Sequence, residues 1–144
     1  TKNASLEPKE AKPMKISERK LNDITILDVE GVICWPDDSR NLKEYIVRLV
    51  DTHRSKILIN LAGVHYIDSS ALGELISLHI KIRRSIYGDL KILNPAKMIT
   101  DLLTVTKLIT VFEVFDDEAA GVKSFELPRR REVAYRAWAI GPCA

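Results

Sequence analysis

An unbroken apolar run leads directly into a helix-start pattern near the middle of the chain. Ile57-Leu58-Ile59-Asn60-Leu61 is a continuous apolar segment, typical of a strand that is buried on both faces of a sheet. After Tyr66-Ile67-Asp68-Ser69-Ser70, apolar residues recur at helical spacing at Leu72, Leu75, Ile76, His79, Ile82 and Ile86, and Gly88 is the expected stop. A buried strand that is followed by an amphipathic helix predicts a strand-helix unit of a parallel sheet.

The same alternation of strands and helices is predicted on both sides of this unit. Ile24–Val29 is β-branched and bounded by turn residues, and Lys15–Arg19 is its expected hairpin partner. We expect helices to begin at Pro36-Asp37-Asp38-Ser39, at Asn94-Pro95 and at Asp116-Asp117-Glu118, and further strands at Leu90–Leu93 and Val111–Phe115. The pattern predicts one α/β domain over residues 14–127, with a small mixed sheet that is mainly parallel and has right-handed crossovers.

Both ends of the chain lack this pattern. Residues 1–13 are small, charged and proline-containing, which predicts a disordered leader. Met14 follows directly, so two interpretations stay open: a native leader, or added residues before a native start. Residues 128–144 mix a basic run with scattered apolar residues, and we expect a separate tail that is either non-native or a short packed element.

Composition excludes several classes of protein. A formal net charge of only +2 does not favour binding to nucleic acid. No apolar run approaches the roughly 20 residues of a membrane span, and no signal peptide is apparent. Cys34 and Cys143 form neither a disulfide framework nor a metal-ligand pair at short spacing, which favours a reducing compartment and a cytoplasmic location.

The sequence offers little for catalysis. A nucleophilic Ser69 or Ser70 would need a nearby base, and the three histidines are His53, His65 and His79. His79 lies on or beside the apolar stripe, where a structural role is expected. No nucleophile elbow, phosphate-binding loop, dinucleotide fingerprint or metal-ligand spacing occurs. We therefore expect a protein that is not an enzyme and needs no cofactor or metal.

The acid and two hydroxyls at the predicted helix start allow two interpretations, which are compatible. Asp68 or Ser69 can cap the helix, with Ser70 in its first turn. Alternatively, one hydroxyl is a regulatory phosphorylation site, because the free N–H groups of a helix start tolerate an added phosphate. Spacing alone does not decide between them.

The chain resembles the STAS domain, and within it the bacterial anti-sigma factor antagonists. The resemblance rests on Ile57 to Leu61 followed by Tyr66 to Gly73, on Leu90 to Pro95, on Leu102 to Leu108 and on Val111 to Ala120. It spans about residues 15–126 and implies a STAS-like layer whose sheet is covered mainly on one side by helices.

The resemblance also implies a partner-switching function. In the family, the serine that follows the aspartate is phosphorylated by an anti-sigma factor that is a serine kinase; that position here is Ser69. The unphosphorylated antagonist binds the anti-sigma factor, phosphorylation breaks the complex, and a serine phosphatase restores it. The ATP belongs to the kinase. The expected partner surface comprises Asp68, Ser69, Ser70, Gly73 and Glu74.

One segment departs from the family pattern. Many relatives have an acidic Gly-Glu-Leu-Asp turn after the second strand, whereas this chain has Gly31-Val32-Ile33-Cys34-Trp35-Pro36. Trp35 is expected to pack in the core, with an exposed partner anchor or a weak homodimer contact as the alternatives. The rival overall is a scaffold or transport-complex STAS module without a phosphate cycle, and a serine hydrolase is a third, less favoured interpretation.

Overall fold

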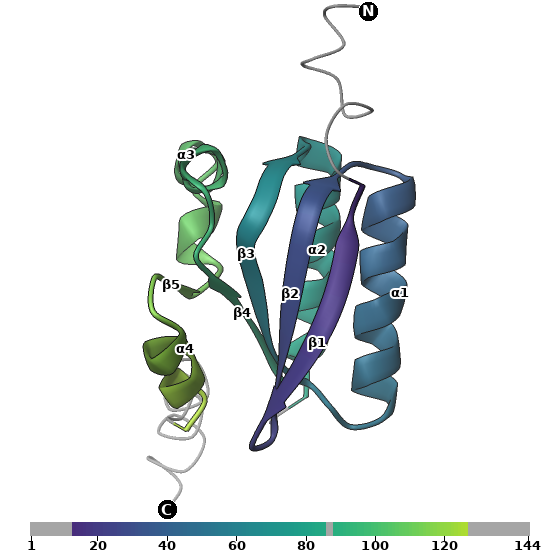
Figure 1. Cartoon of the computed structure of the whole chain (residues 1–144), viewed down its shortest axis with the longest axis vertical. Helices are drawn as coiled ribbons and strands as arrows, with labels where there is room; N and C mark the ends of the chain where they lie inside the picture. The colour runs from purple at the N-terminus through teal and green to yellow at the C-terminus, as the bar shows by residue number, and fades with distance from the viewer. Residues whose placement is uncertain (1–12, 86–87, 127–144) are drawn as a thin grey trace, which may run out of the picture.

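The computed structural model describes residues 13–85 and 88–126, and these form one α/β layer structure (Figure 1). The strands are β1 (Lys15–Leu21), β2 (Ile24–Ile33), β3 (Lys56–Ile67), β4 (Asp89–Leu93) and β5 (Val114–Phe115). The helices are α1 (Asp37–Asp51), α2 (Ser69–Ile82), α3 (Lys97–Val105) and α4 (Glu118–Ser124), with a short 3-10 turn at Leu108–Thr110. The predicted leader and tail lie outside the described residues, apart from Pro13.

The sheet has the order β1-β2-β3-β4-β5, and only the β1–β2 pair is antiparallel. The predicted hairpin is confirmed: it turns at Asn22-Asp23, where Asn22 has a φ of 58°, a left-handed conformation that asparagine tolerates better than most residues. The other pairs are parallel, as strand-helix-strand crossovers require. The predicted mixed, mainly parallel sheet is therefore confirmed.

Most of the helical surface packs on one face of the sheet. Helices α1 and α2 lie side by side on that face, and α4 covers part of the other (Figure 1). Ile57 and Ile59 of β3 face the main core, and Leu58 between them contacts the smaller core beneath α4, so this stretch is buried on both faces as predicted. The main core also includes Leu42, Ile46, Leu75, Leu78, Ile99 and Leu103 from α1, α2 and α3.

Several predicted boundaries were wrong. Strand β3 extends beyond the predicted Ile57–Leu61 segment to Ile67, and its pairing with β2 contains two register irregularities. Helix α2 ends at Ile82, six residues before the predicted stop at Gly88, and Ile86 lies outside the described residues. Strand β5 has two residues, since Phe112 is buried after the 3-10 turn and not within a strand.

Strand β4 carries a buried ionic group that the apolar pattern did not indicate. Lys91 is 3% exposed, and its Nζ lies 2.9 Å from Ser124 Oγ, 3.4 Å from Glu113 Oε1 and 4.0 Å from Asp89 Oδ2. The same ammonium lies 4.6 Å from the centre of the Phe125 ring. Lys91 therefore connects the sheet to the end of α4.

Candidate functional site

Three loops meet at one edge of the sheet, where the parallel strands end. Ile33 at the end of β2 pairs with Ile67 at the end of β3, whereas β4 ends earlier, at Leu93, which pairs with Asn60 of β3. The segments that follow these strands lead into α1, α2 and α3, whose first turns lie at the same end of the molecule (Figure 1). This is where α/β folds most often place their functional residues.

Asp68 connects two of these loops. One carboxylate oxygen, Oδ1, accepts a hydrogen bond of 2.7 Å from the backbone N–H of Ala71 and so caps α2. The other, Oδ2, accepts a hydrogen bond of 2.9 Å from the backbone N–H of Trp35, in the loop between β2 and α1. The backbone N–H of Asp68 donates to Ile33 O at 3.2 Å. The carboxylate therefore fixes the start of α2 and the loop beside it.

Ser69 and Ser70 are the first two residues of α2, and both are exposed. Among the described residues, neither hydroxyl has a hydrogen-bond partner, since Asp68 performs the capping. Their backbone N–H groups belong to the set that a helix leaves without internal partners. Of the two caps considered from the sequence, the structure has Asp68, which leaves the Ser69 hydroxyl available to a second molecule.

Replacing Asp68 by Ala should lower the free energy of unfolding by about 2 kcal/mol, because both a cap and a loop hydrogen bond are lost. Urea denaturation of the purified variant measures the loss. Asp117→Ala is the matched control: Asp117 also caps a helix, α4, by accepting from Ala120 N at 3.0 Å, but it holds no second loop. A loss no larger for Asp68→Ala than for Asp117→Ala would contradict the double function of Asp68.

Trp35 does not pack in the core. Its exposed fraction is 57%, so the expectation of core packing was wrong. The reason is the path of β2: Val32 and Ile33 take the buried positions, 5% and 0% exposed, and the chain then turns outward into α1. Two hydrogen bonds from Asp38 N and Ser39 N to Cys34 O hold this turn.

An open groove lies between Ser69 and α3. Its volume is about 460 Å³, and its lining is mostly apolar. The residues that line it are Tyr66, Ile67, Asp68 and Ser69 on one side and Met98, Asp101, Leu102 and Val105 on the other. Met98 and Leu102 have the spacing of apolar residues on one side of a helix, but periodicity alone could not show that they border a groove and not a sealed core.

Several carboxylates flank this site, and some of them are paired with cations. Asp37, Glu74 and Asp101 form ion pairs with Arg40, Lys43 and Lys97 at distances of 3.8, 3.9 and 2.9 Å. Asp38 and Asp68 have no ion-pair partner among the described residues, and accept hydrogen bonds from backbone N–H groups instead. Burial and then these two carboxylates raise the pKa of the Cys34 thiol, as expected where the field is negative.

The other residues expected at the partner surface are brought to the same end of α2. Ser70 and Gly73 are exposed, and nothing lies within 4 Å of where a Gly73 Cβ would be. Glu74 is partly buried, because it faces α1 through Lys43. Ser69, Ser70 and Gly73 are thus exposed together, whereas Asp68 and Glu74 are partly buried and form contacts within the fold.

The histidines supply no base for the serines among the described residues. His79 is 4% exposed, its Nδ1 lies 3.2 Å from Leu90 O, and its ring packs on Phe112 with centres 4.8 Å apart. The predicted structural role of His79 is therefore confirmed. His53 and His65 are exposed, and neither forms a hydrogen bond with Ser69 or Ser70.

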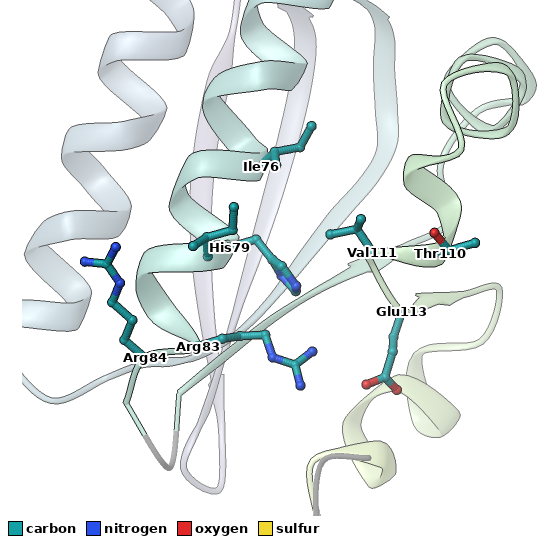
Figure 2. Close-up of a pocket in the computed structure, with 8 residues that line it drawn as sticks. Ile76, His79, Arg83, Arg84, Thr110, Val111 and Glu113 are labelled. Carbon is teal, nitrogen blue, oxygen red and sulfur yellow. The ribbon is translucent and has the colours of Figure 1, made fainter. Parts of the chain in front are cut away.

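A second hollow, of about 690 Å³, lies further along α2 (Figure 2). Arg83 points into it towards Glu113, and Arg84 points away (Figure 2). Arg83 lies 3.9 Å from Asp89, and Glu113 lies 3.4 Å from Lys91, so both of these charged groups already have partners within the fold. The described residues of this hollow therefore make it a weaker candidate for a binding site than the surface around Ser69.

The described residues include no helix that is both long and apolar enough to cross a membrane. They also include no group of three metal-ligating side chains that could hold an ion.

Comparisons with known proteins identify the fold and the family. The model of the STAS domain family matches residues 15–121. A search of curated protein sequences finds no match. An anti-sigma factor antagonist from Mycobacterium paratuberculosis has a similar structure, with a TM-score of 0.70 and 14% identity over 80% of this chain and 96% of that chain.

Two further structures share the fold. The Bacillus cell fate determinant SpoIIAA in its phosphorylated form matches with a TM-score of 0.60 and 12% identity, over 78% of this chain and 98% of that chain. The murine anion transporter Slc26a9 matches with a TM-score of 0.63 and 11% identity, over 75% of this chain and 18% of that chain. At such identities the likeness concerns the fold alone.

Proposed function

The chain belongs to the STAS domain family, and from this we propose that it is an anti-sigma factor antagonist whose partner binding is switched by phosphorylation of Ser69. In its unphosphorylated form it binds an anti-sigma factor that is a serine kinase, and so releases a sigma factor. A serine phosphatase reverses the modification. The chain itself is a binding module and not an enzyme.

The observation that supports this proposal most strongly is that Asp68, and not Ser69, forms the structural hydrogen bonds at the start of α2. Asp68 caps α2 and holds the neighbouring loop, while the Ser69 hydroxyl is exposed and has no hydrogen bond within the described residues. A serine needed for capping would lose a structural hydrogen bond on modification. Ser69 can be modified without that loss, and the helix N-terminus favours the added negative charge.

The chemistry needs nothing from this chain except the hydroxyl. The kinase transfers the γ-phosphoryl group of ATP to Ser69 Oγ, the hydroxyl proton leaves to a base of the kinase, and ADP is the second product. The phosphatase hydrolyses the ester with water and regenerates the hydroxyl and inorganic phosphate. Asp68, Ser70 and Gly73 complete the surface that the kinase contacts, with Glu74 at its border.

The experiment is phosphorylation by each kinase-type anti-sigma factor encoded in the source genome, with radioactive ATP and the purified chain. We expect label in the wild-type chain and in Ser70→Ala, and none in Ser69→Ala. Ser70→Ala is the matched control, because both serines are exposed in the first turn of α2. Full labelling of Ser69→Ala by the cognate kinase would refute the assignment of the acceptor.

The likeness to Slc26a9 favours one alternative, a STAS module that serves a larger assembly without a phosphate cycle. Mass spectrometry of the chain purified from its native cells separates the two functions. A phosphate on the Asp68–Ala71 peptide supports the switch, whereas co-purified transporter subunits without that phosphopeptide support the alternative.

A further inference from the structure

Exposed apolar side chains gather around Ser69. Among the described residues, the large hydrophobic side chains that are exposed are Leu21, Trp35, Tyr66, Ile80, Val105 and Ile109. Three of the six border the site. Tyr66 and Val105 line the groove beside Ser69, and the backbone N–H of Trp35 donates a hydrogen bond to Asp68, the residue before Ser69. Val105 is the most exposed of all, at 80%.

Trp35 is presented on a loop that is already ordered. Its N–H is held by Asp68, and the residues around it are held by Cys34 N to Asp38 Oδ2 at 3.1 Å and by the bonds from Asp38 N and Ser39 N to Cys34 O. Little backbone entropy would therefore be lost on binding. A large aromatic side chain on a rigid loop, exposed in the free protein, has the features of an interface anchor.

The groove beside Ser69 is concave and offers a place for an apolar side chain of a partner. Trp35 is exposed on its loop, whereas Tyr66, Leu102 and Val105 border a depression. The β2–α1 loop and α3 lie on opposite sides of the start of α2 (Figure 1). Ser69 is the first residue of α2 and lines the groove on the α3 side.

The charges around these two parts indicate the chemistry of the partner. Arg40, Lys43 and Lys97 are each paired to a carboxylate, whereas Asp38 and Asp68 have no ion-pair partner among the described residues. A surface with apolar parts and a negative border is complementary to an apolar surface with a basic border.

We propose that the partner binds across Ser69 through two apolar contacts. Trp35 enters a pocket of the partner, and an apolar side chain of the partner enters the groove of Tyr66, Leu102 and Val105. Lysine or arginine residues of the partner face Asp38 and Asp68. This inference rests on the proposed function. Trp35 then supplies, by apolar contact, the anchoring that an acidic turn would supply by charge.

The test is the dissociation constant for the kinase that labels Ser69, measured by calorimetry with a non-hydrolysable ATP analogue. Trp35→Ala should raise the dissociation constant about 30-fold or more, as for other aromatic anchors. Val105→Lys should weaken binding more than Val105→Glu, because the partner's border is basic. Ile80→Ala is the control: Ile80 is 54% exposed but lies about 16 Å further along α2, and less than a twofold change is expected.

A second measurement follows Trp35 directly. The chain has two tryptophans, so Trp138→Phe labelled with 5-fluorotryptophan gives a single ¹⁹F signal from Trp35. This signal should shift and broaden on addition of the kinase. Urea denaturation of each variant verifies that it is folded.

The outcomes separate the two proposals. If no kinase binds or labels the wild-type chain, the proposed function fails, and the inference with it. If the wild-type chain binds and is labelled but Trp35→Ala binds equally well, or the ¹⁹F signal does not change, the function stands and the inference is overturned.

Discussion

Replacing Lys91 by Met should lower the free energy of unfolding by about 3 kcal/mol, although methionine has a similar volume and is apolar. Lys91 is 3% exposed, and its ammonium faces Asp89, Glu113 and the hydroxyl of Ser124. Removing the charge leaves Asp89, which is itself 4% exposed, without one of its two cationic neighbours. The Oδ2 atom of Asp89 has no hydrogen-bond partner in the described structure, so it depends on these charges.

Lys97→Met is the matched control for this prediction. Lys97 also pairs with an aspartate, Asp101, at 2.9 Å, but its side chain is 87% exposed. An exposed pair of this kind contributes at most a few tenths of a kcal/mol, so Lys97→Met should change stability by less than about 0.5 kcal/mol. Equal losses of unfolding free energy for the two Lys→Met variants in urea denaturation would contradict the prediction that buried Lys91 contributes more to stability than exposed Lys97.

The double variant Asp89→Asn/Lys91→Met tests the pairing itself. If the two charges compensate each other, the double variant should be more stable than the sum of the single losses predicts, by about 0.5–3 kcal/mol. Additive losses would mean that Lys91 acts through Ser124 and the Phe125 ring and not through Asp89.

The sequence predicted the parts of the fold that depend on local pattern. The Ile57–Leu61 strand, the β1–β2 hairpin and the stripe of Leu72, Leu75 and Ile82 each follow from burial periodicity and turn chemistry, and the structure confirms them. Local pattern also placed an acid and two hydroxyls at the start of α2.

The parts that depend on tertiary packing could not be predicted. Trp35 is exposed because Val32 and Ile33 take the core positions before it, and a tryptophan in isolation gives no sign of this. Lys91 is buried because α4 folds back over β4, a contact between residues 33 positions apart in sequence. The predicted site residues lie at the end of β3 and the start of α2, as the local pattern indicated. The groove beside them is formed with α3, whose position relative to α2 no local pattern encodes.

Phosphorylation of Ser69 is expected to raise the dissociation constant for the cognate kinase by about 30-fold to several-thousand-fold while leaving the fold intact. The phosphate carries about −1.5 to −2 charges at neutral pH. At an interface that covers Trp35 on one side and the apolar groove on the other, this charge would be desolvated next to Asp68, which costs about 2–5 kcal/mol. The partner's cations recover only part of that cost, since in the proposed complex they already face Asp38 and Asp68.

The free energy of unfolding should stay unchanged or rise by up to about 1 kcal/mol, because the dianion lies at the positive end of α2. Phosphoserine incorporated at position 69 is compared with phosphoserine at position 85, an exposed serine just beyond the end of the same helix. The second variant carries the same charge at the negative end of the helix dipole, so it should keep its affinity and lose a little stability. If phosphoserine at 69 instead lowered stability by more than about 1 kcal/mol, the loss of binding would arise from a disturbed fold. Loss of affinity at constant stability, confined to position 69, is what a switch acting by desolvation at the interface requires.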